Sequence, residues 1–295
     1  MKNDIIEKAN LRKPILWQTM EVMGYKDYSK YPRSIEELKE ELRRIEMKKA
    51  ILVVSFGTSF DETREKTIGA IEKEIAKEFP DYIVKRAFTS GVIMNNLAKR
   101  GIIIPNVVTA LEELSAQGVT DVLVQPTHII PGEEYDKLVS MAESCKDKFS
   151  SFKIGKPLMW NENDYKNVSD FLIKEYGDTE KAVVLMGHGT EHRANDVYLK
   201  LSDILEGHNI FVGTVENKPD IYDVLNKTEN FKDIVLVPFM VVAGDHAVND
   251  MAGDDDESWK SVMENAGRNV EVVLKGVGEY LPIRQIYCEH IRREL

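Results

Sequence analysis

AVVLMGHGTEHRAN, residues Ala182 to Asn195, is the stretch that decides the expected fold. Ala182 to Met186 form an apolar run typical of a strand buried on both faces, and the glycines on either side of His188 end it before a helical segment. Because ligands bind at the carboxyl ends of strands in open parallel sheets, His188 is predicted to lie where an α/β protein performs its chemistry. Taken alone, this histidine also fits a loop residue that hydrogen-bonds its neighbours.

The same strand-and-turn pattern occurs twice in the chain. AILVVSFGTSF at 50–60 aligns with AVVLMGHGTEH at 182–192, and DVLVQPTHIIPGEEYD at 121–136 aligns with DIVLVPFMVVAGDHAVND at 233–250. Glycine and proline coincide at the matching strand ends: Gly57 with Gly189, Pro126 with Pro238, and Gly132 with Gly244. Such self-similarity indicates two copies of one unit. We therefore expect an α/β protein with two similar Rossmann-like lobes, each with a parallel sheet, facing each other across a cleft.

Strands and helices alternate from Lys49 onward, as in βαβ units. Strands are expected near residues 50–56, 82–88, 121–127, 152–157, 181–187, 209–215, 233–242 and 270–278. Helices are expected near residues 63–78, 109–116, 135–148, 164–176, 197–205, 220–225, 258–265 and 283–293. The predicted domains are a short helical N-terminal arm at 1–47, a first α/β lobe at 48–157, a second α/β lobe at 158–282 and a C-terminal helix at 283–295.

Composition and charge exclude several classes of function. The net charge is −11 at pH 7 and no basic cluster stands out, which argues against binding to nucleic acid. No apolar run approaches the length of a membrane span, and the first residues lack the apolar core of a signal peptide. Cys145 and Cys288 match no metal or redox spacing, so we expect ordinary thiols in a cytoplasmic protein. Gly57-Thr58 lacks the spacing of a phosphate loop, so no nucleotide is expected, and homo-oligomerisation stays open.

The two lobes differ in the side chains at their strand ends. His188 replaces Phe56 of the first lobe, and His246 replaces Glu134. Glu216 follows another second-lobe strand, roughly where the first lobe has Ser90. Two histidines and one carboxylate on one side form an open site that suits cobalt, iron, nickel or zinc better than calcium or magnesium. The alternative is that Glu216 is a solvated loop residue and His246 a turn residue.

Other polar residues carry weaker signals. We interpret His192 as a residue at the rim of the cleft, and His128 as a ligand contact or a residue that satisfies the backbone. His208 and His290 are expected on the surface. The acidic run at 254–257 precedes a helix and is expected to be a solvated helix cap.

The quoted stretches, together with VGTVEN at 212–217 and MAGDDDESWK at 251–260, resemble the sirohydrochlorin cobaltochelatases of the anaerobic cobalamin pathway. The resemblance covers residues 49–295, so the arm departs from the family pattern. It implies the class II chelatase fold, with the tetrapyrrole sirohydrochlorin held between two lobes. It also implies that His188, Glu216 and His246 bind the metal, the same residues that the lobe comparison selects.

The activity implied by the resemblance is the ATP-independent insertion of Co²⁺ into sirohydrochlorin in cobalamin (vitamin B12) biosynthesis. We interpret neutral His188 as the catalytic proton acceptor, because an imidazole titrates near working pH. Substrate contacts are expected from Ser55, Phe56, Gly57, Thr58, Ser59, Ser90, His128, Gly132 and Glu133, and charge partners for the substrate carboxylates from Arg64, Arg86 and Arg193. A non-catalytic tetrapyrrole or metal carrier and a chelatase for Fe²⁺ or Ni²⁺ stay open. The duplicated lobes and the lack of a cosubstrate motif disfavour a two-histidine-one-carboxylate oxygenase.

Overall fold

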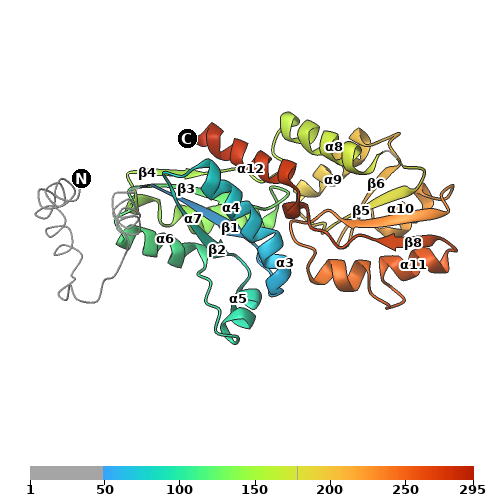
Figure 1. Ribbon diagram of the computed structural model, residues 1–295, viewed down its shortest axis with the longest axis horizontal. Helices are drawn as coiled ribbons and strands as arrows, with labels where there is room; N and C mark the ends of the chain where they lie inside the picture. Colours follow the sequence, from blue (N-terminus) through green and yellow to red (C-terminus); the bar gives the residue numbers. More distant parts are fainter. Residues whose placement is uncertain (1–48, 178) are drawn as a thin grey trace, which may run out of the picture. The chain divides into compact units, whose positions relative to one another are not determined.

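Two four-stranded parallel sheets form the core of the protein (Figure 1). The computed structural model describes residues 49–177 and 179–295, so the predicted arm at 1–47 lies outside the described residues. The first sheet has the order β2-β1-β3-β4 and the second the order β6-β5-β7-β8. The strands are β1 (Lys49–Ser55), β2 (Ile83–Phe88), β3 (Asp121–Pro126), β4 (Ser151–Ile154), β5 (Ala182–Gly187), β6 (Ile210–Thr214), β7 (Asp233–Pro238) and β8 (Asn269–Val272). The identical strand order confirms the predicted pair of similar α/β units, which we call the first and the second lobe.

Helices cover both faces of each sheet (Figure 1). In the first lobe they are α3 (Asp61–Lys66), α4 (Ile68–Glu78), α5 (Gly91–Ala98), α6 (Val107–Ala116) and α7 (Glu133–Glu143). Farther along the chain come α8 (Glu162–Tyr176), α9 (Asp196–Ile204), α10 (Ile221–Lys227), α11 (Trp259–Asn265) and α12 (Leu281–Glu294). Among the described residues, no helix combines the length and the apolar character that crossing a bilayer requires.

Alternation along the central strands divides the core into layers. In β1, Ile51 and Val53 belong to one apolar cluster, whereas Leu52 and Val54 belong to another. The cluster that contains Ile51 and Val53 also takes in side chains from β5, β6 and β7. The two lobes therefore share one continuous core on their inner side, while each keeps a separate cluster on its outer side.

Local chemistry moves several predicted boundaries. The helix expected at 63–78 is two helices that meet at Thr67, whose hydroxyl donates to the Thr63 carbonyl 2.6 Å away and whose backbone leaves the helical region. The strand expected at 233–242 ends at Pro238, because proline has no N–H to continue the ladder. Helix α5 was not predicted, and it is anchored by Leu97, which packs with Phe88 in a small cluster of its own.

The C-terminal helix α12 crosses back to the first lobe. It packs against α4 and β3 of that lobe as well as against α8 (red in Figure 1). The Tyr287 hydroxyl donates to the Thr127 carbonyl at 2.7 Å, directly behind the end of β3. This helix therefore ties the last part of the chain to the first sheet.

The prediction that His290 lies on the surface is wrong. Its ring is buried, with one nitrogen 2.9 Å from the Asp164 carboxylate and the other 3.2 Å from the Lys156 carbonyl. Burial alone would raise the pKa of the Asp164 carboxyl, but hydrogen bonds from His290 and from the backbone outweigh burial and lower that pKa. The pair fastens α12 to the start of α8. His208 is exposed, as predicted.

Candidate metal centre at the strand ends of the second lobe

The backbone repeats itself at the strand ends of the two lobes. The Ser90 N–H donates to the Phe56 carbonyl at 3.2 Å, and the Glu216 N–H donates to the His188 carbonyl at 2.9 Å. An equivalent hydrogen bond thus joins the loop after β1 to the loop after β2 in the first lobe, and the loop after β5 to the loop after β6 in the second lobe. His188 and Glu216 of the second lobe therefore occupy the backbone positions that Phe56 and Ser90 occupy in the first lobe, as the sequence alignment predicts.

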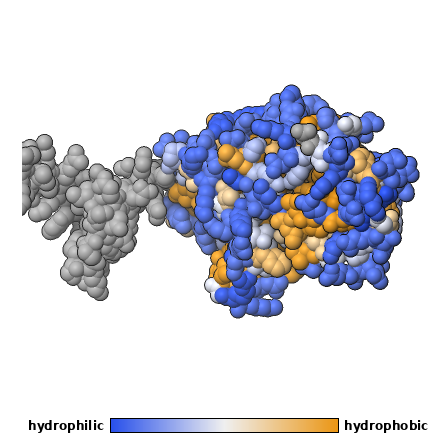
Figure 2. Space-filling model, turned by 45° about the vertical axis from the view of Figure 1, so that its right-hand side comes forward, coloured by the Kyte–Doolittle hydropathy of each residue, from blue (hydrophilic) through white to orange (hydrophobic). Residues whose placement is uncertain are grey.

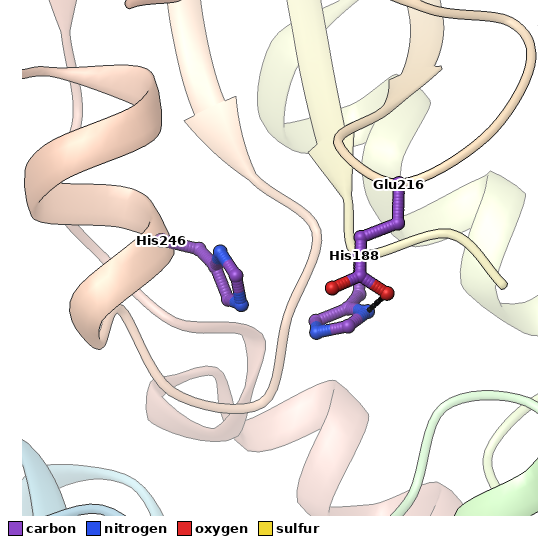
Figure 3. Close-up of side chains that lie close together, drawn as sticks. All are labelled: His188, Glu216 and His246. Carbon is purple, nitrogen blue, oxygen red and sulfur yellow. Dashed lines mark ion pairs between the residues drawn. The ribbon is translucent and has the colours of Figure 1, made fainter.

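Three side chains meet at this end of the second sheet. His188, Glu216 and His246 each offer one potential ligand atom, and these atoms all lie within 4.8 Å of one another. The two imidazole rings stand edge to face, with centroids 4.6 Å apart. Figure 3 shows His188 and Glu216 coming from neighbouring strand-end loops and His246 from the start of a helical turn on the other side. The structure therefore brings the predicted ligand set together, with all three residues at least partly exposed.

The loop conformation orients the His188 ring. Its Nδ1 lies 3.0 Å from the Gly189 carbonyl and 3.4 Å from Glu216 Oε2. With Nδ1 facing these acceptors, Nε2 is the nitrogen free to bind a metal. Gly189 has a φ of +84°, and a Cβ there would come within 2.9 Å of Thr214 Cβ. The turn after β5 therefore requires glycine beside the histidine.

A carboxylate orients the His246 ring. His246 precedes a π-helical turn, η4 (Ala247–Met251), and its Nδ1 lies 2.5 Å from Asp250 Oδ2. Asp250 was not predicted from the sequence. The signal was present, since the two residues stand four apart in DHAVND, a spacing that puts side chains on one face of a helix.

The structure shows the surroundings of each substrate contact that was predicted in the first lobe. Ser55, Thr58 and Ser90 are buried and hold the loops together. The Ser55 hydroxyl accepts from Thr127, the Thr58 hydroxyl accepts from the Phe60 N–H, and Ser90 accepts from the N–H of Ile93 at the start of α5. Phe56 is 48% exposed, Ser59 partly exposed and Glu133 exposed, whereas Gly57 and Gly132 are buried. On the face drawn in Figure 2, hydrophobic areas interrupt a largely hydrophilic surface.

The matching loops of the two lobes approach each other. A Cβ built at Gly132 would lie 3.9 Å from Thr190, and one built at Gly244 would lie 3.9 Å from Thr58. His192 also links the lobes, since its Nε2 lies 3.6 Å from Asp136 Oδ2 on α7. The loops after β3 and β5 thus approach each other, and so do the loops after β1 and β7. The cluster of His188, Glu216 and His246 belongs to the second-lobe side of this contact.

His128 follows β3 and is unusual in its surroundings. Both ring nitrogens are buried, and neither has a hydrogen-bond partner within the described part of the chain. Burial lowers the pKa of the imidazole to about 4, although the nearby Glu134 carboxylate acts in the opposite direction. His128 is therefore neutral near pH 7.

The candidate charge partners are largely engaged already. Arg86 makes two hydrogen bonds to the Glu72 carboxylate, at 2.7 and 2.5 Å. Arg64 is buried and bonds to Asp61 at 2.6 Å and to the Thr58 carbonyl at 3.3 Å. Among the three candidates of the sequence analysis, Arg193 alone is exposed. Arg86 and Arg64 thus brace the protein, a role that the sequence pattern did not reveal. The acidic run at 254–257 is exposed and precedes α11, as expected.

The sequence of the chain matches a family of known proteins. The family model described as cobalt chelatase (CbiK) matches residues 49–295. The sirohydrochlorin cobaltochelatase of Salmonella typhimurium is 41% identical over 257 residues, which cover 84% of this chain and 97% of that protein. The sirohydrochlorin cobaltochelatase CbiKC of Nitratidesulfovibrio vulgaris is 32% identical over 267 residues, covering 88% of this chain and 94% of that protein.

A solved structure shares the fold. SirB from Bacillus subtilis, in a structure with Fe³⁺, superposes with a TM-score of 0.61 and covers 84% of this chain and 95% of its own. The sequences are 18% identical, so this likeness supports the two-lobed chelatase fold and nothing finer.

Proposed function

The chain belongs to the cobalt chelatase (CbiK) family, and on that premise we propose that it inserts Co²⁺ into sirohydrochlorin for cobalamin biosynthesis. The observation that carries the proposal is the cluster of His188, Glu216 and His246, whose ligand atoms lie within 4.8 Å of one another. Two histidines and one carboxylate leave coordination positions open on a divalent ion. An ion held in this way can pass to the nitrogens of a macrocycle, because protein ligands do not surround it.

Insertion also requires that two pyrrole N–H protons leave the macrocycle. We assign His188 as the principal acceptor. Its Nδ1 faces the Gly189 carbonyl, so Nε2 of the neutral ring presents a lone pair to the metal or to a proton. As the ion leaves His188 for the macrocycle, the same nitrogen becomes free to accept one pyrrole proton, and the second proton passes to solvent at this partly exposed site. No step of this sequence needs a nucleotide.

The first lobe supplies the other wall of the proposed substrate site. Phe56 occupies the position of His188, and its exposed ring offers apolar surface to a macrocycle face. His128 is neutral and its two nitrogens lack partners, so a bound tetrapyrrole that supplied one would relieve an unfavourable burial. Ser59, Gly132 and Glu133 of the neighbouring loops are further substrate contacts in this site. We also propose a cytoplasmic location. Its reducing conditions would keep the free, buried Cys145 and Cys288 as thiols.

The decisive experiment is an insertion assay. Co²⁺, Fe²⁺ and Ni²⁺ are each offered with sirohydrochlorin or with protoporphyrin, without nucleotide, and the change in the absorbance of the free macrocycle is followed at substoichiometric protein. We expect multiple turnovers with Co²⁺ and sirohydrochlorin and poor turnover of protoporphyrin, which has fewer carboxylates. Binding without turnover would instead identify a carrier, and preference for Fe²⁺ or Ni²⁺ would identify a chelatase for another metal, since these ligands accept all three ions.

A further inference from the structure

We infer that Asp250 is a positioning residue that fixes the orientation and the tautomer of the His246 ring, so that His246 is the ligand that holds the incoming ion. The inference rests on the proposed function and extends it to a residue outside the ligand set. The observation behind it is the 2.5 Å contact between Asp250 Oδ2 and His246 Nδ1.

The local backbone sets up this contact. Asp250 lies within the π-helical turn that follows His246, and the wider spacing of such turns often marks functional sites. The alignment of the lobes places Asp250 over Leu138, which lies on the regular helix α7 and is buried in the outer core of the first lobe. The second lobe thus replaces a core leucine by a carboxylate at the position that faces its histidine.

The chemistry of the contact follows from the two protonation sites of imidazole. A carboxylate beside Nδ1 accepts its N–H, so the neutral ring carries its lone pair on Nε2, which is the nitrogen left for the metal. The carboxylate also makes the ring a stronger electron donor. His188 differs, because its shorter Nδ1 contact is to the neutral Gly189 carbonyl.

The difference between the two histidines suits a hand-over. His246, supported by a carboxylate, keeps the ion bound, whereas His188, supported mainly by a carbonyl, releases it first. Asp250 thereby assigns different tasks to two chemically identical ligands.

The test measures Co²⁺ binding to the full chain without tetrapyrrole, from the visible absorption of the bound ion. Asp250→Ala and Asp250→Asn are expected to weaken binding about 10–100-fold and to change the band shape, whereas Asp250→Glu recovers part of the loss. Asp245→Ala is the matched control, because it removes an equal charge from an exposed residue of the same loop, and wild-type binding is expected. Thermal unfolding checks that each variant is folded.

A double variant separates action through His246 from independent action. His246→Ala/Asp250→Ala is expected to bind Co²⁺ no more weakly than His246→Ala alone. A further loss in the double variant, or wild-type affinity in Asp250→Ala, overturns the inference. Failure of the proposed function has a different signature, namely a wild-type protein that binds Co²⁺ normally and inserts none into sirohydrochlorin.

Discussion

The first and the second lobe have the same strand order, the same loop-to-loop hydrogen bonds and the same left-handed glycine after the central strand. At three matching positions, however, the first lobe carries Phe56, Ser90 and Glu134, and the second carries His188, Glu216 and His246. The backbone at these positions is therefore the same in both lobes although the side chains differ in chemistry. In the first lobe Ser90 caps a helix, whereas in the second lobe the carboxylate of the matching Glu216 lies beside the His188 ring.

The largest expected difference between the lobes concerns the residues at the ends of β1 and β5. His188→Ala and His246→Ala are each expected to lower the rate of Co²⁺ insertion about 100-fold or more, since loss of supporting contacts alone costs 10–100-fold. Phe56→Ala, the first-lobe counterpart, should raise the KM for sirohydrochlorin about fivefold through lost apolar contact. Steady-state insertion kinetics measure both effects, with His208→Ala as an exposed control.

Excess metal sharpens this comparison. If His188 is the proton acceptor, a large excess of Co²⁺ restores more activity to His246→Ala than to His188→Ala. Equal recovery of the two variants would remove the proton role from His188, and full activity in both at limiting Co²⁺ would exclude the metal centre.

The glycines shared by the lobes should behave alike in stability. Gly57 has a φ of +109° and Gly189 a φ of +84°, and a Cβ at Gly57 would approach Phe88 to 2.6 Å. Gly57→Ala and Gly189→Ala are each expected to lower the free energy of unfolding by about 2–4 kcal/mol, through backbone strain and overlap. Gly189→Ala alone should also weaken Co²⁺ binding, because it moves His188. Denaturant titration compares them with Gly267→Ala, where φ is +80° but no atom lies within 4 Å of the added Cβ.

His128 should make the stability of the protein depend on pH. Its folded-state pKa of about 4 lies below the ordinary value of 6.5, so between these values the unfolded chain binds more protons than the folded one. The free energy of unfolding therefore decreases as pH falls, by about 2 kcal/mol from pH 7 to pH 5 for this group. His128→Met, which introduces the residue of the aligned second-lobe position, should remove that decrease. Denaturant midpoints at pH 5 and 7 measure it, and an unchanged pH dependence would refute the buried, neutral state.

The smallest expected contrast compares the matching residues after β2 and β6. Glu216→Gln should weaken Co²⁺ binding about tenfold with little change in stability, because an amide is a poorer ligand than a carboxylate. Ser90→Ala should leave Co²⁺ binding intact and cost about 1 kcal/mol through the lost cap of α5. Co²⁺ titration and denaturant unfolding of the same two variants make the comparison, and the reverse pattern would show that the lobes do not share a common frame.

The fold was predictable because its signals are local. The apolar runs of β1 and β5 are too short for helices and are bounded by glycine, and the repeated glycine and proline positions revealed the duplication before any strand pairing was known. The same duplication singled out His188, Glu216 and His246 as candidate ligands, since the two copies of a repeat can be compared position by position. Boundaries failed where a side chain competes with the backbone, as at Thr67, or where proline ends a ladder, as at Pro238.

Long-range pairings could not be predicted in this way. His290 stands in a helical pattern that gives no sign of Asp164, 126 residues away, yet the two meet in the interior. In the sequence Arg86 has no evident partner, whereas in the fold it bonds to Glu72 of α4. Such contacts depend on how the helices and strands pack, which the local pattern of a single sequence does not predict.

Helix α12 constrains the order in which the parts of this protein can fold during synthesis. The inner face of the first sheet, with Ile71 and Ile75 of α4, belongs to the same core as Ile283, Ile286 and Ile291 of α12. The residues of α12 follow the whole second lobe along the chain and are therefore synthesised after it. The inner core of the first lobe can thus be completed only after the second lobe has been made. A ribosome that stops before residue 281 releases a chain with an uncovered apolar surface, the kind of feature by which chaperones and proteases recognise unfinished proteins.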